Sequence, residues 1–324
     1  MRMILLITNK DDITVDFIIQ RLKACGYTYY RLNTEDIPNP IGIYFSANEC
    51  IYQLYDKRKD QVIDLSMVSS VYFRRPKISS LEYISDITYQ ERLYLRSELS
   101  FCLEGIYKIL KDSFWINDVF RIREAENKIY QLQLAQEIGF NIPDSIISNN
   151  SNSVERLFAR HSGECIIKPI KSGNMQPTDG SKIIFTSQIA SDAVLDKTRI
   201  TAFPVYMQNE VEKAYDIRCI VVGNQIFAAK IDSQCDNSSK VDWRCATGYL
   251  PHEKITLPLS IQDKAIAITQ KLGLVYSAID FVLDKKGKYV FLECNPNGQW
   301  AWIEKRLGYP ISDSIVTLLS RGKL

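Results

Sequence analysis

The sequence has little histidine and no closely spaced cysteines, and these absences exclude several kinds of site. Its 324 residues include two histidines, too few for a histidine metal cluster. The eight cysteines are scattered without a Cys-x-x-Cys pair, which argues against a zinc site or a disulfide framework. They favour reduced thiols in a cytoplasmic protein. The opening βαβ pattern also lacks the Gly-x-Gly-x-x-Gly turn of dinucleotide sites.

The charge and hydropathy patterns exclude two further kinds of partner. Forty basic and 38 acidic residues give a net charge of +2, so there is no electrostatic case for binding nucleic acid or a membrane surface. No apolar run approaches the length of a membrane span, and the run at residues 3–8 is too short for a signal peptide. A chain of this length has room for two or three domains.

The first 118 residues are expected to form a small α/β domain. A β-run at residues 3–8 precedes a helix that Asp11 or Asp12 caps and Gly26 ends, and a second β-run follows at 27–32. The apolar face of that helix is expected to hold Ile13, Phe17, Ile18 and Leu22. A helix is predicted over 89–111, and short strands are predicted at 41–45, 51–55, 62–65 and 70–76.

The second segment, residues 119–202, is expected to carry two lysines toward a cleft. One helix is predicted over 121–138, closed by Gly139, with Ile129, Leu132 and Leu134 partly inward and Lys128 on another side. A strand at 164–169 carries Lys168 among apolar residues. The polar loop at 171–182 is suited to covering phosphates with backbone N–H groups, although most such loops are simple turns.

The third segment, residues 203–324, is expected to be antiparallel β-structure. An apolar run at 203–211 leads to two runs, 215–222 and 225–231, joined by a Gly-Asn turn typical of a hairpin. A polar loop at 233–248 and a helix at 259–272 follow.

A second hairpin, at 277–298, is the most informative stretch of the chain. Its Lys-Lys-Gly-Lys turn should bring Asp280 opposite Leu292 or Glu293, and strand alternation places Glu293 and Asn295 on one face. Oxygen ligands without histidine or cysteine are the set that Mg²⁺ prefers, with phosphate oxygens completing the shell. The alternative is a surface hairpin with solvated acids, but both acids lie in apolar strands where an unpaired charge is costly.

Several strings resemble the ATP-grasp superfamily, and most closely its microviridin-type branch, the graspetide synthetases that mature ribosomally made peptides. The resemblance extends over essentially the whole chain. It is carried by Val71-Tyr-Phe-Arg-Arg-Pro76, Asn127-Lys128, Lys213-Ala-Tyr-Asp-Ile-Arg218, Val241-Asp-Trp-Arg244 and Leu292-Glu-Cys-Asn-Pro-Asn-Gly-Gln-Trp300. It implies an ATP-grasp fold of the α/β (α+β) class, with a pre-ATP-grasp domain at 1–118 and two α+β subdomains, 119–202 and 203–324, that clamp ATP.

The resemblance also implies roles for individual residues. Lys128 and Lys168 would contact the ATP phosphates, while Gln208, Glu210 and the backbone of Val211 would hold adenine and ribose. Two Mg²⁺ would be bound by Asp280, Glu293 and Asn295. Arg218 would face the γ-phosphate or acyl phosphate, and Arg244 would lie near the acceptor or the leader peptide. Asp216 and Asp232 are candidates for the general base.

Some of these residues have an equally simple structural interpretation. Lys128 could be a solvated helix lysine. Arg74 and Arg75 could pair with acids of the first domain, and structural and functional roles weigh equally for them. Trp243 and Trp300 are better interpreted as packing residues.

The implied activity is ATP-dependent activation of Asp or Glu side chains in a precursor peptide, followed by ester or amide closure with Ser, Thr or Lys. The partner would be that peptide, leader plus core, and a homodimer is compatible with this kind of enzyme. One alternative is an intermolecular ligase of the same fold that adds an amino acid to a peptide or protein carboxylate. Another is a non-catalytic nucleotide-binding scaffold.

Overall fold

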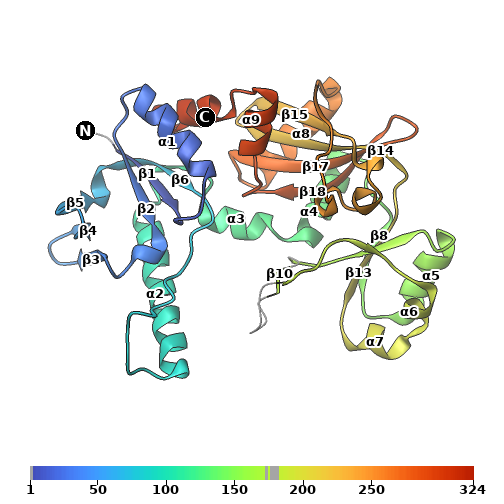
Figure 1. Ribbon diagram of the computed structural model, residues 1–324, viewed down its shortest axis with the longest axis horizontal. Helices are drawn as coiled ribbons and strands as arrows, with labels where there is room; N and C mark the ends of the chain where they lie inside the picture. Colours follow the sequence, from blue (N-terminus) through green and yellow to red (C-terminus); the bar gives the residue numbers. More distant parts are fainter. Residues whose placement is uncertain (1–2, 172–173, 176–181) are drawn as a thin grey trace.

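The computed structural model describes residues 3–171, 174–175 and 182–324. In Figure 1 the N-terminal domain, drawn blue to cyan, is joined through α3 (Val119–Ala125) to the C-terminal sheet and a smaller green and yellow lobe. The C-terminal helix α10 (Ile311–Arg321) returns to lie beside α1 (Thr14–Ala24). Among the described residues no helix combines the length and apolar character needed to cross a bilayer.

The N-terminal domain is built on a parallel sheet with the strand order β2-β1-β6-β7. Helix α1 connects β1 to β2, so the predicted βαβ opening is confirmed. Strands β2 and β6 lie on opposite sides of β1. The connection from β1 therefore runs toward β2, whereas the connection from β6 runs the other way, toward β7. The strands are β1 (Met3–Thr8), β2 (Tyr29–Asn33), β6 (Val68–Phe73) and β7 (Phe114–Ile116).

Helix α1 differs from the prediction at its first turn. Asp12 accepts a hydrogen bond from the backbone N–H of Thr14 at 3.0 Å, but the N-cap position is occupied by Ile13, so neither predicted aspartate is the N-cap residue. Ile13, predicted on the apolar face, is 72% exposed because it precedes the first helical turn. Gly26 follows the helix with a φ of +72°, as a C-terminal glycine should. The buried apolar residues of the helix are Val15, Ile18 and Leu22.

The remaining predicted elements of this domain are present. Three antiparallel strands form a separate sheet: β3 (Ile41–Ser46), β4 (Ile51–Asp56) and β5 (Gln61–Asp64). Helix α2 (Tyr89–Ile109) begins with a capping box. Thr88 accepts from the backbone N–H of Glu91 at 3.2 Å, and the Glu91 carboxylate accepts from the backbone N–H of Thr88 at 2.7 Å.

The single helix predicted over 121–138 is wrong: the chain forms α3 and α4 (Lys128–Ile138) instead. The break arises because the Asn127 side chain accepts a hydrogen bond from the backbone N–H of Tyr130 at 3.1 Å and caps a new helix. Lys128 therefore occupies the first turn of α4. Ile129, predicted partly inward, is 55% exposed, whereas Leu134 is buried. Gly139 ends α4 in the left-handed conformation, as predicted.

A four-stranded sheet with the order β12-β9-β13-β8 forms the smaller lobe. Strand β13 (Val205–Asn209) pairs with β8 (Ser145–Ser148) and β9 (Cys165–Lys168), not with the C-terminal sheet. Sheet membership therefore places the end of this lobe after Asn209 rather than at residue 202. The lobe also contains β12 (Ser187–Gln188), α5 (Ser151–Arg160), α6 (Ser191–Leu195) and α7 (Lys197–Ala202).

The loop predicted to cover phosphates, 171–182, falls mostly on residues outside those that the structure describes. Within it, β10 (Asn174–Met175) pairs with β11 (Lys182–Ile183) in an antiparallel ladder. The role of this loop in phosphate binding stays a prediction.

The C-terminal sheet is antiparallel with the order β16-β15-β14-β17-β18. The Gly-Asn hairpin is confirmed, since Val222 pairs with Gln225. On one face α8 (Leu259–Lys271) packs with α4. The strands are β14 (Lys213–Val222), β15 (Gln225–Ile231), β16 (His252–Ile255), β17 (Tyr276–Asp284) and β18 (Tyr289–Asn295), and α9 (Ala301–Leu307) follows β18.

The other face of this sheet shares one apolar core with the N-terminal domain. Leu6 of β1 and Ile18 of α1 belong to the same buried cluster as Ile220 of β14 and Ile315 of α10. Trp300 is fully buried in this cluster, where its ring meets Phe17 edge-on at 6.0 Å, so its predicted packing role is confirmed. Continuous burial across the boundary stabilises one arrangement of the N-terminal domain and the C-terminal sheet.

Candidate active site

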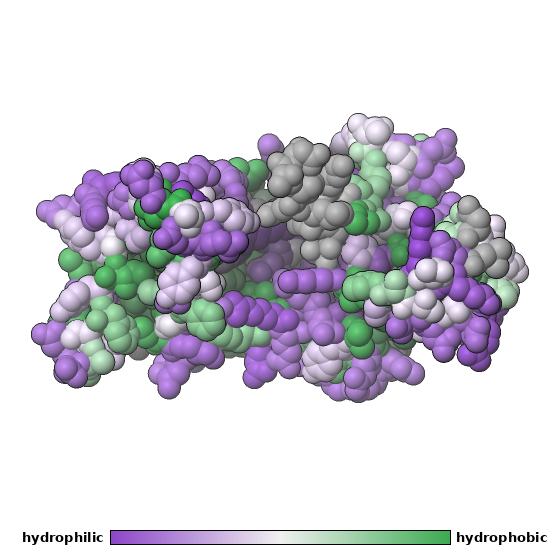
Figure 2. Space-filling model, turned by 90° about the horizontal axis from the view of Figure 1, so that it is seen from below, coloured by the Kyte–Doolittle hydropathy of each residue, from purple (hydrophilic) through white to green (hydrophobic). Residues whose placement is uncertain are grey.

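A cleft of about 1040 Å³ lies between the parallel sheet of the N-terminal domain, the sheet of the smaller lobe and the C-terminal sheet. Figure 2 shows hydrophilic side chains gathered in a hollow on this face of the molecule. Of the site residues predicted from the sequence, only the candidate base Asp232 is not among the residues that line it; the others, which do, are Lys128, Lys168, Gln208, Glu210, Val211, Asp216, Arg218, Arg244, Asp280, Glu293 and Asn295. The fold thus brings together residues that are up to 167 positions apart (Lys128 to Asn295).

The β17–β18 hairpin supplies the oxygen ligands. Asp280 pairs directly with Glu293, one of the two registers predicted, and the Asn295 amide donates to the Glu293 carboxylate at 3.1 Å. Two carboxylates and one amide converge here. Among the described residues no group of three or more His, Cys, Asp or Glu side chains is placed to hold a metal ion. A metal at this hairpin would therefore need the Asn295 amide and oxygens of a bound phosphate to complete its shell.

Neighbouring cations set the charge of the two acids. Burial raises the pKa of Asp280 to about 6, although Arg218 opposes the rise. Burial acts in the same direction on Glu293, but Lys128, Arg244 and Lys168 outweigh it, so that the pKa of Glu293 is lowered. Glu293 is consequently a carboxylate at neutral pH, and Asp280 is the easier of the two to protonate.

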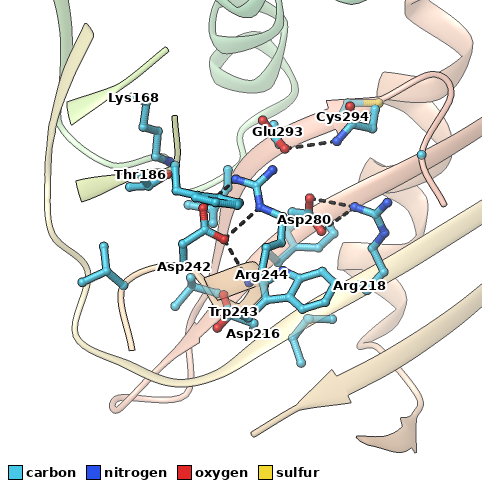
Figure 3. A pocket seen from close by; sticks show the side chains of 18 of the residues that line it. Lys168, Thr186, Asp216, Arg218, Asp242, Trp243, Arg244, Asp280, Glu293 and Cys294 are labelled. Atoms are coloured by element: carbon cyan, nitrogen blue, oxygen red, sulfur yellow. Dashed lines mark hydrogen bonds and ion pairs between the residues drawn. The ribbon is translucent and has the colours of Figure 1, made fainter. Parts of the chain in front are cut away.

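Arg218 lies across the sheet from Asp280. Strands β14 and β17 place the two residues in register, and the Arg218 Nη1 atom donates to both Asp280 carboxylate oxygens at 2.8 Å (Figure 3). The Arg218 Nε atom is buried without a hydrogen-bond partner among the described residues. A guanidinium with an unused buried N–H can still donate a hydrogen bond to a phosphoryl oxygen.

The two lysines occupy different electrostatic settings. The Lys128 ammonium donates to the Pro169 carbonyl at 2.9 Å and lies 3.6 Å from the Glu293 carboxylate, which positions it over the hairpin. Lys168 lies at the end of β9, and its side-chain ammonium makes no hydrogen bond or ion pair within the described part of the chain. Burial lowers the pKa of Lys168 to about 8, against the attraction of Glu293. An unpaired cation in this position favours an anion beside it.

The end of β13 presents polar groups to the cleft. Gln208 is fully buried, and its amide nitrogen donates to the Ser145 hydroxyl at 2.9 Å and the Tyr206 hydroxyl at 2.6 Å. Its amide oxygen is buried without a partner among the described residues, so it can accept from a ligand. Glu210, the residue after β13, lines the cleft, and one of its carboxylate oxygens accepts from the Gln188 amide at 2.7 Å.

Asp216 and Arg244 are engaged in ion pairs, a feature that the sequence did not reveal. The Asp216 carboxylate pairs with the Lys213 ammonium at 2.8 Å and accepts from the Ser233 hydroxyl at 2.5 Å, so both partners hold it in place. This arrangement favours a structural role over that of a general base. Arg244 donates two hydrogen bonds, of 2.8 and 2.6 Å, to Asp242 and remains half exposed at the cleft.

Sequence reasoning also missed two buried amides that fix the backbone around the hairpin. The Gln131 side chain donates to the Cys294 carbonyl and accepts from the Cys294 N–H, both at 2.8 Å, and so fixes β18 between Glu293 and Asn295. Asn117 donates to the Pro296 carbonyl at 3.0 Å. Gln131 lies in a helix and Asn117 follows a short strand. The spacing of residues in these segments does not indicate that either amide binds a distant backbone group.

Two lobes closing on a cleft that holds lysines, a free glutamine carbonyl and an acidic antiparallel hairpin define the ATP-grasp class of ligases. The model of the RimK-like ATP-grasp domain matches residues 125–319, more than half of the chain, and that of the MvdD pre-ATP grasp domain matches residues 3–123. The chain therefore belongs to the RimK-like ATP-grasp family. The resemblance to ATP-grasp enzymes that the sequence indicated is confirmed, and so is the predicted fold class.

Known proteins of this kind resemble the chain over different lengths. A probable alpha-L-glutamate ligase of Haemophilus influenzae is 27% identical over 209 residues, which cover 64% of this chain and 66% of that protein. The macrocyclase MdnC of Microcystis aeruginosa MRC, bound with precursor peptide MdnA, is 25% identical with a TM-score of 0.86, over 98% of this chain and 99% of MdnC. The peptide-maturing branch is thus represented among the structural neighbours.

A second solved structure extends the likeness in fold. The RiPP-associated ATP-grasp ligase of Chryseobacterium gregarium, in complex with ADP and a leader and core peptide, has a TM-score of 0.88 at 23% identity. The alignment covers 99% of this chain and 97% of that ligase. The whole chain therefore has the fold of such ligases, from the first strand to the last helix.

Proposed function

We propose that the protein activates Asp or Glu side chains of a ribosomally made precursor peptide with ATP and closes ester or amide links to Ser, Thr or Lys of the same peptide. The observation that supports it most is the convergence of Lys128, Lys168 and Arg218 on the Asp280–Glu293 hairpin in one cleft. Positioning and charge neutralisation are what phosphoryl transfer needs from a protein. The full-length likeness to a macrocyclase favours a peptide as the substrate.

The residues of the cleft fit ATP as co-substrate. The free carbonyl of Gln208 is an acceptor for an adenine amino group, Glu210 lies where it can accept from ribose hydroxyls, and Val211 offers its backbone. Lys128 and Lys168 would meet the phosphates. Asp280, Glu293 and Asn295 would hold two Mg²⁺, which would supply positive charge to neutralise the phosphates.

The reaction would proceed in two transfers. A substrate carboxylate oxygen attacks the γ-phosphorus, the bond to the β-phosphate oxygen breaks, and ADP leaves with an acyl phosphate formed. A hydroxyl or amine of the peptide then attacks the acyl carbon, loses its proton and displaces inorganic phosphate. Arg218 would stabilise charge on the transferring group, and half-exposed Arg244 would face the acceptor or leader segment. Each ring closed removes one water from the peptide.

A second candidate function comes from the glutamate ligase relatives. Such an enzyme would add a free amino acid to a peptide or protein carboxylate, using the same nucleotide and metal residues. The two functions differ in where the acceptor comes from. A macrocyclase draws the acceptor from the peptide that already occupies the cleft, whereas the intermolecular ligase needs a separate amino-acid pocket.

Intact mass spectrometry distinguishes these functions. A candidate precursor peptide rich in Thr, Asp and Glu, sought among short reading frames next to this gene, is incubated with the protein, ATP and Mg²⁺. Losses of one water per bond, with ADP released, are the expected result. A mass gain equal to an amino-acid residue would replace macrocyclisation with the intermolecular ligase. Unchanged peptide mass, with no ADP formed beyond a Glu293→Gln control, would contradict both activities.

The setting of the reaction is also part of the proposal. The eight cysteines, all described, form no disulfide in the structure, which suits the reducing cytoplasm where ATP and Mg²⁺ are available. The division into a domain at 1–118 and two clamping subdomains is retained, with β13 assigned to the smaller one.

A further inference from the structure

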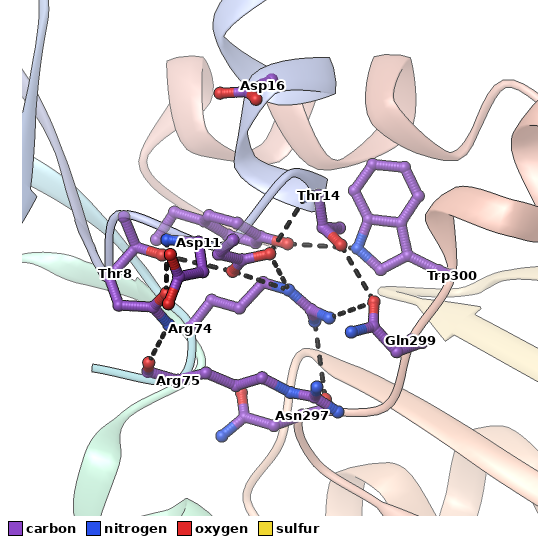
Figure 4. A network of polar contacts seen from close by, with 12 residues as sticks. Thr8, Asp11, Thr14, Asp16, Arg74, Arg75, Asn297, Gln299 and Trp300 are labelled. Carbon is purple, nitrogen blue, oxygen red and sulfur yellow. Dashed lines mark hydrogen bonds and ion pairs between the residues drawn. The ribbon is translucent and has the colours of Figure 1, made fainter. Parts of the chain in front are cut away.

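Two adjacent arginines that follow β6 are used in different ways. Arg74 is 1% exposed, forms an ion pair with Asp12 at 3.1 Å and donates to the Gln299 side chain at 2.7 Å (Figure 4). It also donates to the Gly298 carbonyl at 3.1 Å. These contacts join the N-terminal domain to the loop after β18. Arg74 is therefore fully occupied as a structural residue.

Arg75 faces the cleft instead. The Arg75 side chain lines the same cleft as Arg218 and is exposed to the solvent in that cleft. Its guanidinium makes no hydrogen bond or ion pair among the described residues. Its backbone has a φ of +46°, a left-handed conformation that is strained for an arginine. The Asn9 amide holds this conformation by donating to the Arg75 carbonyl at 2.5 Å. The fold thus maintains a strained backbone that directs a free cation into the cleft.

The position of Arg75 in the N-terminal sheet is one where α/β proteins bind ligands. It follows the carboxyl end of β6, and Asn9 follows the carboxyl end of the neighbouring β1. Since β2 lies on the other side of β1, the connections diverge between β1 and β6. Open parallel sheets bind ligands outside the carboxyl ends of their strands at such a switch point.

The charges around Arg75 favour an anion at this point. Although the Arg75 side chain is open to solvent, the surrounding walls of the cleft partly desolvate it and lower its pKa, and the cations Arg74 and Arg218 lower the pKa further. The acid that opposes this, Asp12, is already paired with Arg74. An anion bound between Arg75 and Arg218 would relieve the repulsion between the cations.

We propose that Arg75 binds the carboxylate of the acidic peptide side chain that is to be activated, an assignment that rests on the proposed function. The guanidinium fork matches a carboxylate with two parallel hydrogen bonds. The nucleotide residues come from other elements, with Lys168 on β9 and Gln208 on β13, whereas Arg75 enters from the N-terminal domain. The carboxylate would lie beside Arg218 and Asp280, where the γ-phosphate is transferred.

Kinetics with Arg75→Gln, Arg75→Lys and Arg75→Gly test this assignment. The probe is the candidate precursor peptide, rich in Thr, Asp and Glu, that the mass spectrometry above shows to be modified, and the KM values of this peptide and of ATP are measured by ADP release and product mass. We expect Arg75→Gln to raise the peptide KM roughly 10- to 100-fold, the range for losing a hydrogen bond to a charged group, with the ATP KM unchanged. Arg75→Lys keeps the positive charge and should raise the peptide KM less than Arg75→Gln does. Lys77→Ala, an exposed residue of the same segment paired with Asp11, is the control.

A second readout separates substrate binding from folding. Arg75→Gly removes the side chain and suits the positive φ, so its melting temperature should not fall below that of the wild type. By fluorescence anisotropy in Mg²⁺ and ADP, the wild type should prefer the acidic peptide over its Asn and Gln counterpart, and Arg75→Gly should lose that preference.

Three results would overturn the assignment in distinguishable ways. If Arg75→Gln behaves like Lys77→Ala while the wild type modifies the peptide, Arg75 has no substrate role and the proposed function stands. If the ATP KM rises and the peptide KM does not, Arg75 binds the nucleotide instead. If the wild type changes no peptide mass, the proposed function fails and the role of Arg75 fails with it.

Discussion

Arg218 and Asp280 form an ion pair directly across the β14–β17 ladder, with Nη1 at 2.8 Å from each carboxylate oxygen. The pair is positioned by strand register and not by a loop, so it is present before any ligand binds. It keeps a charged acid at a buried point of the cleft where burial by itself favours the neutral form. The arginine thus has a structural partner and a spare donor, Nε, for the reaction.

Breaking this pair should destabilise the protein. Arg218→Met leaves the Asp280 charge uncompensated, and we expect the free energy of unfolding to fall by about 3–5 kcal/mol in urea denaturation. Arg121→Met removes one partner of an exposed pair with Glu124 and should cost less than about 1 kcal/mol. If the two variants lose equal stability, the buried pair is worth no more than a surface pair. Arg218→Met/Asp280→Leu should recover most of the loss.

Gly298 leaves no room for a side chain beside this arginine. A Cβ atom there would lie 2.3 Å from the Ala278 Cβ and 2.6 Å from the Arg218 Nη2. We expect Gly298→Ala to destabilise the protein by about 1–3 kcal/mol or more, as overpacked sites do, and to displace Arg218. Gly105→Ala, in α2 with no atom within 4 Å, should instead stabilise by about 0.5–1 kcal/mol. The melting temperatures of both variants test these expectations. An unchanged melting temperature of Gly298→Ala would contradict the close contact at this glycine.

Much of the site could be predicted because the residues that carry it stand in regular strands. Alternation in β18 places Glu293 and Asn295 on one face, and the hairpin turn fixes Asp280 opposite Glu293. Lys168 was visible because a charge interrupts an apolar strand. The alternation of side chains along a strand and the presence of a charge among apolar residues are local properties, so a single sequence reveals them.

The parts that could not be predicted depend on local backbone conformation and on strand pairing, and the spacing of residues along the chain reveals neither. The Asn127 cap that splits one helix into α3 and α4 competes with a helical periodicity that continues across it. The pairing of Asp216 with Lys213, and the different directions of Arg74 and Arg75, follow from backbone conformations that composition does not encode. Strand β13 resembles its C-terminal neighbours in sequence but pairs with β8 and β9.

Glu293 should be required for turnover but not for folding. Glu293→Gln keeps the shape and the contact with Asn295 while removing the charge that pairs with Lys128 and that would hold the proposed Mg²⁺. A contact of this kind contributes several kcal/mol, so we expect product formation to fall roughly 100-fold or more with an unchanged circular dichroism spectrum. Raising the Mg²⁺ concentration should recover part of the rate. Wild-type turnover in this variant would contradict the metal assignment.

Glu210 should make the protein selective for ribose. Its carboxylate lies at the end of β13 with one oxygen held by Gln188, so the other can accept from ribose hydroxyls. We expect the wild type to bind ATP about tenfold more tightly than 2′-deoxy-ATP, and Glu210→Ala to bind both equally. Isothermal titration calorimetry measures the four affinities. If Glu210→Ala still discriminates between the two nucleotides, the ribose is held elsewhere; Glu212→Ala, an exposed acid nearby, is the control.

Lys168 should couple ATP binding to pH. Its pKa of about 8 in the folded protein lies below the ordinary lysine value of 10.5, because burial disfavours the charged form. Bound phosphates favour the charged form, so ATP affinity should fall as pH rises above about 8, and binding there should take up a proton. Calorimetry at pH 7 and pH 9 in buffers of different ionisation enthalpy measures both effects. Lys168→Met should bind ATP more weakly at pH 7 and show a smaller change between the two pH values.

The same shift determines how the stability of the ligand-free protein depends on pH. Between about pH 8 and 10.5 the unfolded chain keeps the Lys168 proton that the folded protein has lost, so this residue makes stability rise with pH across that window. At pH 7 the folded protein carries a half-buried Lys168 ammonium that has no partner among the described residues, and Lys168→Met should therefore be at least as stable as the wild type. Urea denaturation of both proteins at pH 7 and pH 9.5 checks this, and the gap in stability should narrow at the higher pH. A Lys168→Met protein that is less stable at pH 7, with a gap that does not change, would mean that the lysine is a structural residue and not a phosphate ligand.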